Sequence, residues 1–174
     1  ELRRRAAAAG LAGRIHPIEA DMHRLPLASE AFDVLWAEGS AYIVGFDQAL
    51  RSWRRLLKPY GSMAWTELNW FRPDAPDELR AFWAEEYPGM RSIKENLEAI
   101  DLARYRVVGH FNLPVESWWA DYYTPLRERL EKLAPKYADR PAARAVMEQA
   151  RREIEMHERY ADYYGYTFYV MQRR

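Results

Sequence analysis

The stretch FDVLWAEGSAYIVGF, residues 32–46, decides the fold of this chain. Its first five residues are apolar except for Asp33, as in a buried strand of a core. The strand then runs into a carboxylate at Glu38, the small pair Gly39–Ser40 and the aromatic Tyr42. A core strand that ends in such residues is typical of a parallel strand that opens into a ligand site.

An amphipathic helix and a second strand follow this stretch. Apolar side chains recur at the spacing of one helical face, at Phe46, Leu50, Trp53 and Leu57. Pro59 and Gly61 end the predicted helix, and SMAWTELNWF, residues 62–71, has the composition of a strand. Residues 32–71 therefore form a predicted strand–helix–strand unit with parallel strands and a right-handed crossover.

The rest of the chain continues the alternation of helices and strands. We expect a short strand at 14–20, two short helices within 74–102, a strand at 105–114, helices over 115–163 with a break near 135–141, and a final strand at 164–174. This order predicts an α/β fold.

Composition excludes several classes of protein. The 174 residues fit one domain, and 26 basic residues balance 26 acidic ones, so no general attraction to nucleic acid or an anionic membrane is expected. The chain has no cysteine, and its four histidines lack metal-ligand spacing, so we expect no metal site. No apolar run approaches the roughly 20 residues of a membrane span. We expect a soluble cytoplasmic domain.

Two stretches of the sequence, in the same order along the chain as in the family, resemble a known family. EADMHRLPLASEAFDVLWAE (19–38) and LLKPYGSMAWTE (56–67) resemble the second half of class I S-adenosylmethionine-dependent methyltransferases, in the small-molecule branch called type 11. Residues 38–46 fit the pattern EGxxYxxGF of a bacterial subgroup, and residues 163–169 fit its YYGYxFY ending. One departure is Tyr60, where the family usually has glycine.

The resemblance implies a Rossmann-like sheet of strand order 3-2-1-4-5-7-6 with a helical cap, here 72–102 and 115–163. The family's glycine-rich turn and its acidic ribose ligand follow strands 1 and 2, and no G-x-G-x-x-G occurs in this chain. We therefore expect residues 1–174 to be one methyltransferase domain, N-terminally incomplete and inactive alone. The missing strands would lie between the strand at 14–20 and the strand at 32–38, so an unbroken sheet is not expected.

The resemblance also assigns S-adenosylmethionine as the cofactor. It implies that Asp21 accepts a hydrogen bond from the adenine amino group, with Met22 and His23 beside it. Ala37 would contact the methionine part through its backbone, and the Glu38 carboxylate would hold the ammonium group or face the acceptor. The alternative for Asp21 and Glu38 is a structural role as caps of the segments that follow them.

Methyl transfer is an in-line displacement, which needs alignment of the acceptor and, for a hydroxyl or amine, a base. The candidate bases are Glu38, Glu67 and His110, and the two carboxylates should share one cavity with Asp21 at its adenine side. Candidate substrate-binding residues are the aromatic side chains near the same rim, Tyr42, Trp70, Trp118 and Tyr122. For these, the alternative is ordinary packing within a helical lid.

The leading interpretation is a methyltransferase that acts on a small-molecule acceptor, with no nucleic-acid or membrane partner. An alternative is a catalytically inactive module that keeps the fold for binding or dimerisation, and a homodimer stays open. A third interpretation, a nicotinamide-dependent oxidoreductase, is disfavoured because no Ser/Tyr/Lys-type cluster is present and residues 21–26 fit the methyltransferase pattern. The sequence does not name the acceptor.

Overall fold

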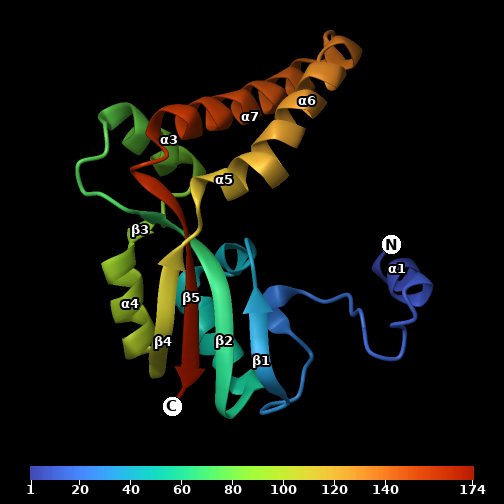
Figure 1. Ribbon diagram of the computed structural model, residues 1–174, viewed down its shortest axis with the longest axis vertical. Coiled ribbons are helices and arrows are strands. Elements are labelled where there is room, and N and C mark those ends of the chain that lie inside the picture. Colours follow the sequence, from blue (N-terminus) through green and yellow to red (C-terminus); the bar gives the residue numbers. More distant parts are fainter.

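The computed structural model describes residues 1–174 as a mixed sheet with helices against one face and above one end (Figure 1). The strands are β1 (Phe32–Ala37), β2 (Leu57–Trp70), β3 (Arg91–Ser92), β4 (Tyr105–Asn112) and β5 (Tyr164–Arg173). The α-helices are α1 (Leu2–Ala8), α2 (Phe46–Trp53), α3 (Asp77–Glu86), α4 (Ile93–Leu102), α5 (Val115–Trp118), α6 (Thr124–Leu133) and α7 (Pro141–Tyr160). A π-helical turn, Trp119–Tyr123, joins α5 to α6.

The sheet has the order β1-β2-β5-β4, and the short β3 extends from the end of β2. β1 and β2 are parallel, whereas β5 is antiparallel to both of its neighbours. The last strand of the chain therefore lies between β2 and β4, which precede it in sequence. This arrangement matches the 4-5-7-6 part of the expected strand order, and the expected fold class is confirmed.

The prediction of a strand at 14–20 is wrong. Apart from a turn at its first residue, this segment has no regular secondary structure and is largely exposed. A strand needs a neighbour for its backbone hydrogen bonds, and none pairs with this segment. The expected break in the sheet is also absent, because β1 is the edge strand and the sheet runs unbroken from β1 to β4.

Helices α2 and α4 cover one face of the sheet. Their apolar side chains pack with Trp65 and Tyr169 of the central strands in one core cluster, in which the Tyr105 hydroxyl donates to the Leu50 carbonyl at 3.1 Å. On the opposite face Trp36 packs at a tilt against Phe168, with ring centroids 5.3 Å apart, but is 64% exposed, so this face is open to solvent. Because α4 lies against β4, it belongs to the sheet layer and not to the expected cap (Figure 1).

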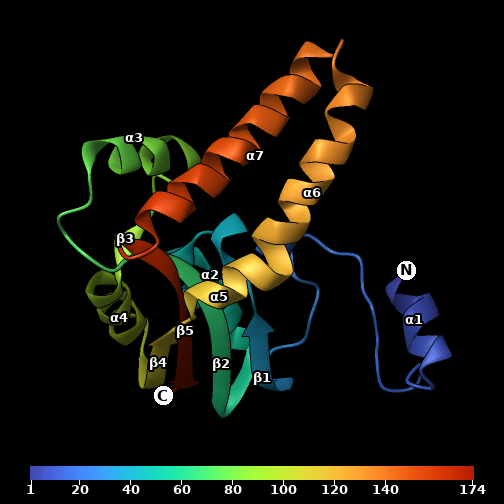
Figure 2. The same cartoon turned by 45° about the horizontal axis from the view of Figure 1, so that its top comes forward.

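Helices α3, α5, α6 and α7 form a second layer above the carboxyl end of β2, whereas α1 lies apart at the N-terminus (Figure 2). Here α3, α5, α6 and α7 share a second core cluster that includes Phe82, Trp118, Tyr123 and Tyr164. The α6–α7 pair projects away from the sheet as a helical hairpin (Figure 2). No helix in the structure has both the length and the apolar composition needed to cross a bilayer. The assignment of the other predicted cap residues, 72–92 and 115–163, stays a prediction.

Strand β2 begins earlier than the sequence predicts, at Leu57, because the helix closes in a 3-10 turn at Arg54–Leu56. The register against β1 then jumps between Leu57 and Ser62, so the intervening residues bulge out. Tyr60 sits in this bulge with φ of +64°, and its side chain is 76% exposed. The left-handed conformation explains why a glycine is favoured at this position.

Replacing Tyr60 by glycine should raise the free energy of unfolding by about 0.5–1 kcal/mol. Relief of the left-handed backbone outweighs the extra entropy that glycine gains in the unfolded chain. Urea denaturation of both proteins measures the difference. The control is Tyr60→Ala, which removes the same exposed ring but keeps a Cβ; equal stability of the glycine and alanine variants would contradict the prediction.

Candidate functional site

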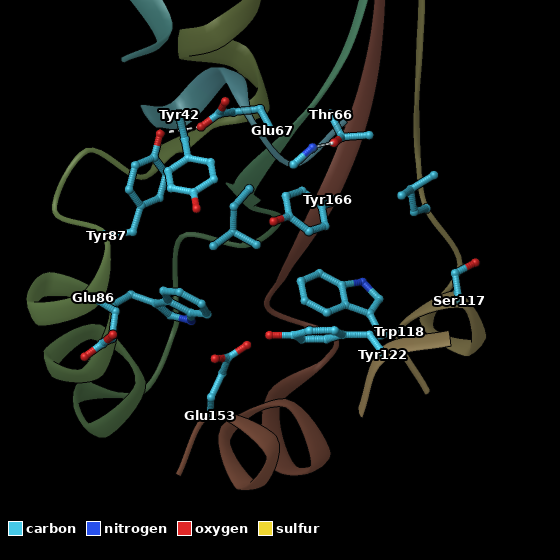
Figure 3. Close-up of a pocket in the computed structure, with 14 residues that line it drawn as sticks. Tyr42, Thr66, Glu67, Glu86, Tyr87, Ser117, Trp118, Tyr122, Glu153 and Tyr166 are labelled. Carbon is cyan, nitrogen blue, oxygen red and sulfur yellow. Dashed lines mark hydrogen bonds between the residues drawn. The ribbon is translucent and has the colours of Figure 1, made fainter. Parts of the chain in front are cut away.

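A cavity of about 480 Å³ lies between the carboxyl ends of β1 and β2 and the second helical layer. Figure 3 shows the side chains around it, which come from the sheet, from the loop after β1 and from α3, α5 and α7. The lining residues are Gly39, Tyr42, Thr66, Glu67, Leu68, Trp83, Glu86, Tyr87, Leu113, Ser117, Trp118, Tyr122, Glu153 and Tyr166. This is the edge of an open α/β sheet at which ligands generally bind.

The loop after β1 forms one wall of the cavity. Gly39 has φ of +54°, a conformation that side chains rarely adopt, and its backbone N–H donates to the Thr66 hydroxyl at 2.9 Å. A Cβ at Gly39 would meet only the Tyr166 hydroxyl, 4.0 Å away. The turn therefore fastens the end of β1 to β2 and leaves backbone, with no side chain, facing the cavity.

Glu67 is the buried carboxylate of the site, with a residue exposure of only 3%. The Tyr87 hydroxyl donates to its Oε1, whereas Oε2 is buried and has no hydrogen-bond partner. Burial raises the pKa of Glu67 to about 7. The Tyr87 hydrogen bond and the charge of Arg91 lower this pKa, but by less than burial raises it. Near neutral pH this carboxyl group is therefore poised between its acid and base forms.

Two further carboxylates line the cavity from the helical layer. Glu153 on α7 accepts a hydrogen bond from the Tyr123 hydroxyl at 3.1 Å, and burial raises the pKa of its carboxyl group. Glu86 on α3 accepts a hydrogen bond from the Gln149 side chain, so it ties α3 to α7. No group of three or more His, Asp or Glu side chains in the structure is arranged to hold a metal ion.

Aromatic rings make up much of the cavity wall. Trp118 stacks on Tyr166 with ring centroids 4.8 Å apart, and on Tyr123 at 5.5 Å. Tyr42, in the loop after β1, meets Tyr87 edge-on at 6.1 Å. Burial raises the pKa of Tyr166 to about 12, and the charge of Glu67 adds to the effect, so its hydroxyl stays protonated and available as a donor.

Four of the predicted site residues meet at this cavity, namely Glu67, Tyr42, Trp118 and Tyr122. Glu38 does not, because its exposed carboxylate accepts a hydrogen bond from the Trp36 indole. Ala37 pairs with Trp65, so Glu38 follows level with Thr66, and its carboxylate turns back along β1 to the indole of Trp36 instead of lining the cavity. The expectation that the two carboxylates share one cavity is wrong.

Two other predicted residues also lie outside the cavity. His110 is exposed on β4, where its ring stacks on Tyr169 at 6.2 Å. Trp70 ends β2, packs against the second core cluster and has the Arg80 guanidinium 5.9 Å above its ring. Neither side chain lines the cavity, so His110 is not placed as a base there and Trp70 is not placed in contact with a substrate.

The predicted cofactor residues lie beside β1. The Asp21 carboxylate is exposed and caps a short turn by accepting hydrogen bonds from the backbone N–H and the ring of His23, both at 2.9 Å. The backbone hydrogen bond from His23 is the main reason why the pKa of Asp21 is lowered. Met22 is half buried and its carbonyl accepts from the Trp53 indole at 3.1 Å, while Ala37 ends β1.

The sequence did not single out Glu153, Tyr87 or Tyr166 for the site. Tyr166 lies in the quoted YYGYxFY stretch and sits opposite Leu68 of β2, so a strand register would have placed it there. Glu153 and Tyr87 reach the cavity only through the packing of α7 and of the end of α3, which no local pattern reveals.

Comparison with known proteins agrees with this geometry. Residues 1–65 match the sequence profile of a family described as "Methyltransferase domain". A stretch of 103 residues, 59% of this chain, is 31% identical to a malonyl-[acyl-carrier protein] O-methyltransferase from Methylovorus sp. (strain MP688) and covers 33% of that protein. The chain thus spans about a third of the length of this curated relative.

Solved structures show the same fold. YjhP from E. coli superposes with a TM-score of 0.81 at 23% identity, over 99% of this chain and 71% of that one. A SAM-dependent methyltransferase from Geobacter sulfurreducens, in complex with S-adenosyl-L-homocysteine, superposes with a TM-score of 0.74 at 22% identity. The match covers 99% of this chain and 70% of that one. This chain has the methyltransferase fold. The family resemblance seen in the sequence is therefore confirmed.

The raised pKa of Glu67 predicts a pH-dependent cost to stability. Its folded-state pKa, about 7, lies above the ordinary value of 4.5, so the folded chain binds this proton more tightly than the unfolded chain. Proton binding by Glu67 therefore adds to the free energy of unfolding below pH 4.5. This contribution, about 3 kcal/mol, is lost as the pH rises through 7. Glutamine does not titrate, so the free energy of unfolding of Glu67→Gln minus that of the parent should increase by about 3 kcal/mol from pH 4.5 to above pH 7. Urea denaturation of both proteins at a series of pH values measures this difference.

The matched control is Glu128→Gln, which removes an exposed carboxylate on α6. Its stability should follow that of the parent at every pH. A constant difference between the parent and Glu67→Gln from pH 4 to pH 8 would show that Glu67 has an ordinary pKa.

Proposed function

We propose that this chain is part of an S-adenosylmethionine-dependent methyltransferase that acts on a small-molecule acceptor. The observation that carries the proposal is Glu67, a buried carboxylate with one free oxygen that lines a cavity at the ligand-binding edge of a methyltransferase fold. The family match over residues 1–65 supports the same reaction class. No observation favours the alternative of an inactive module, and the expected inactivity of this chain alone stays a prediction.

The residues present fit part of the cofactor. The exposed Asp21 carboxylate has the chemistry to accept from an adenine amino group, with Met22 and His23 adjoining it. At the end of β1, Gly39 presents bare backbone to the cavity, next to Ala37 and Glu38. S-adenosylmethionine supplies an electrophilic methyl group on a sulfonium, whose positive charge suits the aromatic and acidic cavity wall.

In this proposal Glu67 is the catalytic base. An acceptor N–H or O–H placed against the unpartnered Oε2 would pass its proton to the carboxylate as the acceptor atom bonds to the methyl carbon. Tyr87 holds the other oxygen and so fixes the direction of the carboxylate. Because the pKa of Glu67 is near 7, the group exists partly as a carboxylate at neutral pH.

The aromatic side chains would bind and align the acceptor. Trp118 is buried and stacked, so it offers a fixed apolar surface, while Tyr42 and Tyr122 are each about half exposed at the mouth of the cavity. Alignment of the acceptor in this cavity would supply several kcal/mol of the barrier reduction. A homodimer stays a prediction.

Cofactor binding is the first test. The protein in its full natural length should bind S-adenosylhomocysteine in calorimetry at micromolar to millimolar ligand. Asp21→Ala should weaken binding, because the adenine amino group loses its acceptor, at a cost of about 1–3 kcal/mol. Absence of binding at millimolar ligand would refute the proposed function.

Glu67→Gln tests the catalytic role once an acceptor is in hand. The variant should bind S-adenosylhomocysteine as the parent does, whereas its turnover should fall by about 10²- to 10⁴-fold and lose the acid limb of the pH profile near 7. The exposed carboxylate variant Glu128→Gln serves as the control and should retain parent turnover. Unchanged turnover in Glu67→Gln would remove Glu67 from the mechanism.

A further inference from the structure

The charges around the cavity all have one sign. Its 14 lining residues include the carboxylates of Glu67, Glu86 and Glu153, and none is lysine, arginine or histidine. Arg91 lowers the pKa of Glu67 through its charge, but its guanidinium is held by Asp47 in a bidentate ion pair, with both contacts at 2.8 Å. No cation of the chain therefore occupies the cavity to neutralise these groups.

The polar groups converge on one space. In Figure 3 the hydroxyl groups of Tyr42, Tyr122 and Tyr166 and the carboxylate of Glu153 all point toward the middle of the cavity. Glu67 lies at the sheet end of this space and Glu153 at its opposite end, on α7 (Figure 3). The polar groups that a ligand would meet here are thus carboxylates, which only accept a hydrogen bond when ionised, and tyrosine hydroxyls, which both donate and accept.

Two buried polar atoms of the wall lack partners. Glu67 Oε2 is unsatisfied in a residue that is 3% exposed, and the indole N–H of Trp83 is unsatisfied in a residue that is 7% exposed. Unpaired buried polar atoms cost stability, so the free Oε2 of Glu67 at the cavity points to a ligand that pairs with it. A donor is needed there, since a carboxylate can only accept, whereas the Trp83 indole can only donate and does not bear on the charge of the ligand.

The remaining wall is aromatic. Trp83, Trp118 and the tyrosines present rings to the same space, and ring faces attract cations as well as apolar groups. A ligand that carries a positive charge on a small apolar or aromatic body would satisfy both parts of the wall. An acidic ligand would place a like charge beside two partly buried carboxylates and would find no cation to pair with.

We propose that the acceptor is an amine on a small apolar body, bound as its ammonium ion between Glu67 and Glu153 within the aromatic wall. This inference rests on the proposed methyl transfer and specifies the substrate class of the same cavity. It differs from the acidic malonyl acceptor that the name of the curated relative gives for that protein.

The chemistry balances with the groups present. The bound ammonium passes one proton to Glu67 and becomes a neutral amine with a free electron pair. That pair forms the N–C bond to the methyl group while the C–S bond breaks, and the electrons of the C–S bond stay on sulfur. The positive charge of the sulfonium is thereby transferred to the methylated nitrogen, and the sulfur is left as a neutral thioether.

Three probes of similar shape test the charge preference. 2-Phenylethylamine, 2-phenylethanol and 3-phenylpropionate differ mainly in carrying a positive charge, no charge or a negative charge. In NMR titrations of the full-length protein at pH 8, the amine should bind at least about tenfold more tightly than the alcohol, because its hydrogen bonds are charge-assisted. The carboxylate should bind more weakly than both.

Two glutamate variants test whether Glu153 produces the preference for the positively charged probe. Glu153→Gln should weaken amine binding about tenfold and leave alcohol binding unchanged, since it removes a charge but little volume. Glu128→Gln, which removes an exposed carboxylate on α6, should leave binding of all three probes unchanged. An equal loss for amine and alcohol in Glu153→Gln, or preference of the parent for the carboxylate probe, would overturn the inference.

A competition experiment separates acceptor from cofactor. Saturating S-adenosylhomocysteine should leave the amine affinity within about twofold, because acceptor and cofactor bind together in a methyl transfer. Displacement of the amine would mean that the carboxylates serve the cofactor, which overturns the inference but not the proposed function. Absence of S-adenosylhomocysteine binding would instead overturn the proposed function, and with it the acceptor role of the amine.

Discussion

The pairing of β2 with both of its neighbours is the constraint on which the rest of the structure depends. On one side it is parallel to β1, and on the other it is antiparallel to β5 along residues 62–70. The first pairing brings the loop at Gly39 to Thr66, and the second brings Tyr166 from near the end of the chain to the same edge. The cavity exists because these three segments, distant in sequence, end side by side.

Much of this arrangement could be predicted from residues 32–71, whose strand–helix–strand pattern is local and strongly periodic. The final strand was recognised too, and the family resemblance placed it between its neighbours. The strand predicted at 14–20 does not form, because the pattern of one segment does not show whether a pairing partner exists for it. The cavity position predicted for Glu38 is wrong because the sequence shows where a strand ends but not how its last side chain turns, and this carboxylate turns back to the Trp36 indole.

The buried Glu67 destabilises the fold when it is charged, but its raised pKa suits it to proton transfer. Burial disfavours its charged form, and only Tyr87 partners it, so a purely structural residue here would be better apolar. Perturbed carboxyl groups of this kind are frequent at functional sites, where the local cost is offset by packing elsewhere. In the same cavity wall Trp118 stacks on both Tyr123 and Tyr166.

The most direct test of this account is the titration of the Glu67 side-chain carboxyl carbon by ¹³C NMR, assigned by its absence in Glu67→Gln. The account predicts a midpoint near pH 7 in the free protein. Saturation with 2-phenylethylamine should lower that midpoint, since a nearby cation favours the carboxylate. A midpoint near 4.5 that is insensitive to the amine would show an ordinary, solvated carboxylate and would contradict the account.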